Sequence, residues 1–170
     1  NTITNIISRE LITTPIVNFG LSGRGRMEPE VIKAVNAIDA QIYIIDCLAN
    51  MTSSELIPQI LTLYTNAVDS IKKYHPNAGI IITEHPGYAD AETNLKRKKS
   101  VIYANNELKR AYKEILKKDY SNIYYLSKEE IGIDFKSDYA DYIHPNDKGM
   151  YVYATKYLEL IREVQKNIQP

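Results

Sequence analysis

The sequence has little that would tie the chain to a membrane, a metal or an internal disulfide. Cys47 is the only cysteine, and there is no tryptophan among the 170 residues. One cysteine excludes an internal disulfide and a cysteine-based metal site, and it leaves the redox compartment undecided. No apolar run approaches the roughly 20 residues that span a bilayer. Because 21 basic and 21 acidic residues cancel, the charge predicts no attraction to nucleic acid or an anionic membrane.

Two kinds of bound group also find no pattern in the sequence. The three histidines and the carboxylates show no spacing typical of metal ligands. The glycines at positions 20, 23 and 25 do not make the G-x-G-x-x-G pattern of a dinucleotide site. We therefore expect neither a metal nor a cofactor. No Pro- or Gly-rich linker interrupts the chain, which indicates one domain over residues 1–170.

Apolar runs of strand length alternate with segments of helical period. The strand candidates are 15–19, 41–46, 78–83 and 122–126, and the main helix candidates are 4–11, 28–38, a long helix ending near 74, 94–118 and 147–168. Such alternation predicts a parallel, flavodoxin-like sheet with helices on both faces, in three α/β/α layers. Ligands of these sheets bind outside the carboxyl ends of the strands. We expect the polar segments 20–25, 47–51 and 84–88 to converge there on one crevice.

Asp141 and His144 form the most suggestive pair in the sequence. A carboxylate three residues before a histidine can accept the Nδ1 proton, which leaves Nε2 free to act as a base. Pro145 stiffens the turn that follows. The spacing alone equally suits a surface histidine beside an aspartate in a loop.

Gly23 and Asn50 add two candidate hydrogen-bond donors near the same crevice. A glycine at a turn lets a backbone N–H approach a substrate oxyanion, and an asparagine after the next strand can donate to the same oxygen. Taken singly, Gly23 is also explained as turn punctuation and Asn50 as a cap before Thr52.

Taken together and in this order, these residues resemble the SGNH or GDSL esterases and lipases. Residues 18–23 (Asn-Phe-Gly-Leu-Ser-Gly) resemble the second sequence block of that family, and 141–145 (Asp-Tyr-Ile-His-Pro) match its last block. Residues 48–51 (Leu-Ala-Asn-Met) keep the asparagine of the third block but depart from its usual Gly-x-Asn-Asp. Residues 20–30 are similar to a bacterial subgroup of these hydrolases.

The resemblance implies a serine-type ester hydrolase acting on a small ester. His144 would be the base and Asp141 its partner, with Gly23 and Asn50 in the oxyanion hole. The family favours small acyl esters, including acetyl groups on carbohydrates, and no lid-like apolar segment points to long-chain lipids. It also favours a periplasmic or secreted location, although residues 1–7 lack the pattern of a signal peptide. The sequence does not indicate an oligomeric state.

The nucleophilic serine of the family is not identified in this chain. The family carries it just after a first, central strand, ahead of the helix that corresponds to residues 4–11. Ser8 is predicted to lie within that helix, Ser22 belongs to the second block, and Ser53 and Ser54 fall in a capping turn. We assign none of them this role and expect the domain to be incomplete at its N-terminal side, without that strand.

Two alternatives stay open. His85 and Tyr142 are candidate substrate contacts, although a structural loop also explains His85. The chain could instead be a non-catalytic module that binds a small molecule or carbohydrate on the same fold. A flavodoxin-like binding domain shares the strand–helix alternation, but it has no reason to keep Asn50 and His144 together.

Overall fold

Three parallel strands form the sheet in the computed structural model, which describes residues 2–168. The order is β1 (Ile42–Ile45), β2 (Gly79–Thr83) and β3 (Ile123–Leu126), so β2 is central and pairs with both neighbours. All five β2 residues are buried. A strand covered on both faces needs apolar side chains throughout, as predicted from the continuous apolar run at 78–83.

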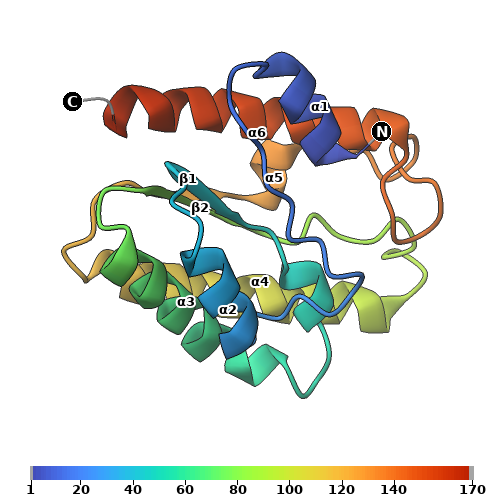
Figure 1. Cartoon of the computed structure of the whole chain (residues 1–170). Coiled ribbons are helices and arrows are strands. Elements are labelled where there is room, and N and C mark those ends of the chain that lie inside the picture. The colour runs from blue at the N-terminus through green and yellow to red at the C-terminus, as the bar shows by residue number, and fades with distance from the viewer. Residues whose placement is uncertain (1, 169–170) are drawn as a thin grey trace.

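Helices cover both faces of the sheet and complete the predicted three α/β/α layers (Figure 1). Helices α2 (Pro29–Asn36), α3 (Ile60–Tyr74) and α4 (Leu95–Leu116) pack below the sheet in this view. Above it, α1 (Ile3–Glu10) lies against α6 (Asp147–Ile168). Each layer has its own apolar core, because alternate β2 side chains point to opposite faces.

Three further short helices lie within residues 2–168. They are the 3₁₀ turns η1 (Leu48–Met51) and η2 (Ile57–Gln59) and the helix α5 (Lys128–Ile131). None was predicted as a separate element. Pro58 lies in η2, directly before α3. A capping box begins α5: Ser127 accepts from the Glu130 N–H, and Glu130 accepts from the Ser127 N–H.

The predicted strand at 15–19 is wrong. Residues 15–21 have no helix or strand assignment, and Val17, Phe19 and Leu21 are 40–58% exposed. An extended segment becomes a strand only when a neighbour satisfies its backbone groups, and no strand among residues 2–168 pairs with this one.

Strand β1 lies at an edge of the sheet. Its residues pair only with β2, and Ile44 is 37% exposed. An edge strand keeps a row of unpaired N–H and C=O groups. The edge of β1 opposite β2 is therefore open in the described part of the chain.

No helix within residues 2–168 is both long and apolar enough to cross a membrane.

The contact between β2 and α6 leaves no room for a methyl group at Gly79. A Cβ there would lie 2.3 Å from Val164 Cγ1, and Val164 is fully buried. We expect Gly79→Ala to lower the free energy of unfolding by about 1–3 kcal/mol, measured by urea denaturation. Gly25→Ala is the control, because the nearest atoms to a Cβ there lie at 3.9 Å.

A double-mutant cycle tests the cause. Val164→Ala should cost less stability in the Gly79→Ala protein than in the parent, because it removes the clashing methyl group. Equal costs in the two backgrounds would contradict the proposed contact.

Candidate active site

The carboxyl ends of the three strands open into loops at one end of the sheet, toward the right of Figure 1. These loops are 46–52, 84–94 and 127–146, and the segment 20–28 lies beside the first of them. Hydrogen bonds tie the loops into one series. They run from Asn50 Nδ2 to the Gly25 oxygen (3.1 Å), between the Thr52 and Tyr88 hydroxyls (3.3 Å), from the Ala89 N–H to the Tyr142 oxygen (3.0 Å) and from the Tyr139 hydroxyl to the Gly87 oxygen (3.0 Å).

Asp141 and His144 form a direct pair. His144 Nδ1 lies 2.9 Å from Asp141 Oδ2, and both side chains are more than half exposed. Asp141 Oδ1 also accepts from the backbone N–H groups of Ile143 and His144, each at 2.6 Å. These bonds, first the one from the His144 ring, hold the pKa of Asp141 well below its usual range. A carboxylate acceptor at Nδ1 selects the tautomer whose Nε2 carries the lone pair.

The loop that carries this pair is braced from both ends. Tyr139 and Pro145 form an isolated antiparallel bridge, and the Ala140 N–H donates to the His144 oxygen at 2.9 Å. The Asn146 side chain then donates to the Ser137 oxygen and accepts from the Gly149 N–H. Asn146 thereby caps the first turn of α6 and fixes the direction in which the loop leaves it.

The buried side chain of Asp138 also anchors the loop that carries His144. Its carboxylate is 2% exposed and accepts from the Asp134 N–H, the Ser137 hydroxyl and Lys148 Nζ, the last at 2.6 Å. The Lys148 ammonium is the main reason that the pKa of Asp138 is lowered. Only a glycine at position 149 allows this packing, because a Cβ there would lie 2.2 Å from the backbone oxygen of Asp138.

Asn50 and Gly23 lie at the opposite end of this series of hydrogen-bonded loops from Asp141 and His144. The Asn50 amide donates one hydrogen bond, to Gly25, and an amide nitrogen carries two hydrogens, so one donor remains. Ser22 and Gly23 both have positive φ, 47° and 80°, and the Arg24 N–H donates to the Leu21 oxygen at 3.0 Å. The two positive φ angles and this hydrogen bond define an exposed type I′ turn.

The structure joins the predicted residues in two groups rather than one. Asn50 contacts the segment that carries Gly23, and Asp141 contacts His144, but no hydrogen bond within residues 2–168 links His144 to Asn50, to Gly23 or to any serine. The two groups are connected indirectly, through the hydrogen bonds that join loops 46–52, 84–94 and 127–146.

The two candidate substrate contacts differ in exposure. Tyr142 is 65% exposed, and its backbone oxygen is bonded to Ala89. His85 is only 3% exposed, lies edge-on to Tyr88 with 4.5 Å between ring centroids, and has a pKa that burial lowers to about 4.

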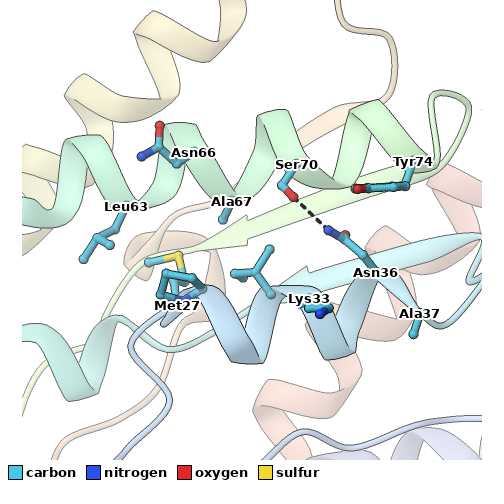
Figure 2. Close-up of a pocket in the computed structure, with 11 residues that line it drawn as sticks. Met27, Lys33, Asn36, Ala37, Leu63, Asn66, Ala67, Ser70 and Tyr74 are labelled. Carbon is cyan, nitrogen blue, oxygen red and sulfur yellow. Dashed lines mark hydrogen bonds between the residues drawn. The ribbon is translucent and has the colours of Figure 1, made fainter.

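A separate groove of about 510 Å³ lies between α2 and α3 (Figure 2). Met27, Leu63 and Ala67 supply apolar lining, and Asn36 donates to the Ser70 hydroxyl at 2.8 Å. None of the candidate active-site residues lines this groove, so we do not assign it to the reaction. Within residues 2–168 no group of three or more His, Cys, Asp or Glu side chains could hold a metal ion.

The sequence did not single out Asp138, Tyr139 or Gly87. Asp138 precedes Asp141 by three residues, which is a detectable spacing, but its burial depends on Lys148 and α6. The Tyr139–Gly87 bond joins loops 52 residues apart, and no local pattern indicates such a contact.

Comparison with known proteins adds a family to this geometry. The sequence model of the GDSL-like Lipase/Acylhydrolase family matches residues 2–162. A crystal structure described as a candidate GDSL-like lipase from Bacteroides ovatus ATCC 8483 superposes with a TM-score of 0.79 at 28% identity, over 88% of this chain and 43% of that one. No curated protein matches.

A second solved structure shares the fold. The salicylyl-acyltransferase SsfX3 from a tetracycline biosynthetic pathway superposes with a TM-score of 0.77 at 12% identity, over 96% of this chain and 49% of that one. This chain thus spans less than half the length of each of these two proteins. Since the family match extends over nearly the whole chain, the protein belongs to the GDSL-like lipase/acylhydrolase family.

Proposed function

We propose that the chain supplies the base and the oxyanion donors of a serine-type acylhydrolase that acts on small esters. Membership of the GDSL-like family supports a hydrolase- or acyltransferase-type reaction. The observation that carries the assignment is the 2.9 Å contact between His144 Nδ1 and the carboxylate of Asp141, because it leaves Nε2 as a base.

The proposed reaction is acyl transfer through a serine ester. His144 Nε2 takes the serine proton as the serine oxygen attacks the ester carbonyl, and Asp141 stabilises the imidazolium that forms. The second Nδ2 hydrogen of Asn50 and the N–H of Gly23 donate to the oxyanion. His144 then protonates the leaving alcohol, and water, activated by the same imidazole, releases the acid.

The serine itself is not among the residues that we assign. Ser8 lies in α1, Ser22 in the exposed turn before Gly23, and Ser53 and Ser54 in the turn before η2. We propose that a strand pairing with the free edge of β1 brings the nucleophile to the carboxyl end of the sheet. The unpaired backbone of β1 and the exposed Ile44 support this position.

For the substrate, we propose a short acyl group, such as acetyl, on a hydroxylated alcohol such as a carbohydrate. Tyr142, exposed in the same loop as His144, offers an aromatic surface to that alcohol.

The 170-residue chain on its own should hydrolyse p-nitrophenyl acetate at close to the rate in buffer, because loss of the nucleophile typically costs about 10⁶-fold. A fluorophosphonate probe followed by peptide mass spectrometry should label no serine. The protein expressed from the whole gene is the comparison. Turnover by the 170-residue chain that the probe blocks would show that one of its own serines is the nucleophile.

In the whole-gene protein, His144→Ala should lower kcat by about 10⁴-fold or more, and Asp141→Asn by a smaller factor, because the histidine transfers the proton and the aspartate orients it. His75→Gln is the matched control, since His75 lies beside α2, bonded to the Asn36 oxygen. Full activity of His144→Ala would exclude the proposed base. Absence of both turnover and serine labelling in the parent would favour the binding module instead.

Gly149→Ala should disturb the site through the backbone. The added Cβ would clash with the backbone oxygen of Asp138 at 2.2 Å and with Pro145 Cβ at 2.9 Å. The clash would shift the loop that holds His144. We expect kcat to fall by about 10²-fold, measured well below the unfolding temperature. Gly79→Ala, which strains the core instead, should keep kcat under the same conditions. Equal kcat losses in the two variants would attribute the effect to general instability.

A further inference from the structure

His85 is held rigidly at the carboxyl end of the central strand. Its N–H donates to Asn105 Oδ1 and its oxygen accepts from Asn105 Nδ2, both at 3.0 Å. Asn105 lies on α4 and is itself buried. A side chain of another helix thus fixes the His85 backbone from both directions.

The hydrogen bonds also fix the protonation of the ring. The Gly87 N–H donates to His85 Nδ1 at 2.9 Å, so Nδ1 carries the lone pair and Nε2 carries the hydrogen. Burial lowers the pKa of His85 to about 4. At neutral pH the ring is therefore uncharged, and Nε2 is a hydrogen-bond donor.

That donor is buried and has no hydrogen-bond partner within residues 2–168. Its neighbour Tyr88 meets it edge-on, with an interplanar angle of 69°, and contact with a ring face is a weaker interaction than a hydrogen bond to oxygen. Asn36 Oδ1 and Asp90 Oδ1 are also buried without a partner, but they are acceptors, which proteins leave unsatisfied more readily than donors.

The surroundings of His85 belong to the candidate active site. The Tyr88 hydroxyl is hydrogen-bonded to that of Thr52, which lies two residues after Asn50. The N–H of the next residue, Ala89, donates to the Tyr142 oxygen. His85 therefore lies in the loop that connects the proposed oxyanion donor to the loop of the proposed base.

We propose that His85 Nε2–H is a specificity-determining donor, which binds an uncharged oxygen of the alcohol part of the ester. This inference rests on the proposed function. A neutral donor suits a hydroxyl or ring oxygen, as in a carbohydrate, and it gives no charge-based preference for an anionic group. His85 takes no proton in the reaction, so its contribution lies in substrate binding.

Two substitutions separate the donor from the structural role of the ring. In His85→Asn the amide oxygen can replace Nδ1 as the acceptor for Gly87, but nothing replaces Nε2–H. In His85→Gln the longer amide can present a donor near the position of Nε2. Urea denaturation of both variants checks that each is folded as stably as the parent before kinetics are compared.

The assay uses the whole-gene protein with methyl 6-O-acetyl-glucopyranoside and phenyl acetate. His85→Asn should lower kcat/KM for the acetylated glucoside roughly five- to tenfold, mainly through KM, which is the loss expected for one neutral hydrogen bond. Phenyl acetate, without the extra oxygens, should change less than twofold, and His85→Gln should restore part of the preference. Equal effects on the two esters, or no hydrolysis of the glucoside by the parent, would overturn the inference.

The failure of this inference is distinguishable from failure of the proposed function. If His144→Ala abolishes turnover while His85→Asn leaves the ratio of the two substrates unchanged, only the role of His85 is wrong. In addition, the ¹⁵N signal of His85 Nε2 should shift when methyl glucopyranoside is added to the parent. An unchanged signal, as expected if Tyr88 or an ordered water is the partner, would contradict the proposal.

Discussion

Strand β2 must satisfy its backbone and its side chains entirely within the protein, and the rest of the fold follows from that constraint. It pairs on both edges and is buried on both faces, and its burial continues past its end into Glu84. The Glu84 carboxylate has no exposed surface and accepts from the Tyr125 hydroxyl, the Lys128 N–H and Lys109 Nζ. A buried carboxylate persists only with such partners. Through these contacts Glu84 links β3, the start of α5 and α4, directly before His85 in the sequence.

The sequence predicted those strands and helices whose burial leaves a hydrophobic pattern among neighbouring residues. The run at 78–83 and the helical period from 147 to 168 correspond closely to β2 and α6, because burial on two faces and on one helical face leaves those periods in the sequence. Residues 15–19 have the composition of a strand but lack a pairing partner. The sequence of α5 contains a full capping box, yet four residues are too few to show a period.

The candidate site divides in the same way. Asp141 and His144 are three residues apart, so their contact is local, and the spacing made the pair a candidate in the sequence. The burial of His85 was not predictable, because it depends on Asn105 and Tyr88. His75 is likewise hydrogen-bonded to a neighbouring helix, at the Asn36 oxygen, and its side chain is only 12% exposed. In both histidines the ring environment is set by a neighbouring element of the fold.

The edge position of β1 also has a colloidal consequence. Its four residues, Ile-Tyr-Ile-Ile, are uncharged and contain neither proline nor glycine. Folded proteins usually protect such an edge with a lysine, a proline or a covering element, because an open one can template strand addition between molecules. A covering strand would therefore do more than complete a catalytic group: it would keep copies of the chain apart at high concentration and during synthesis.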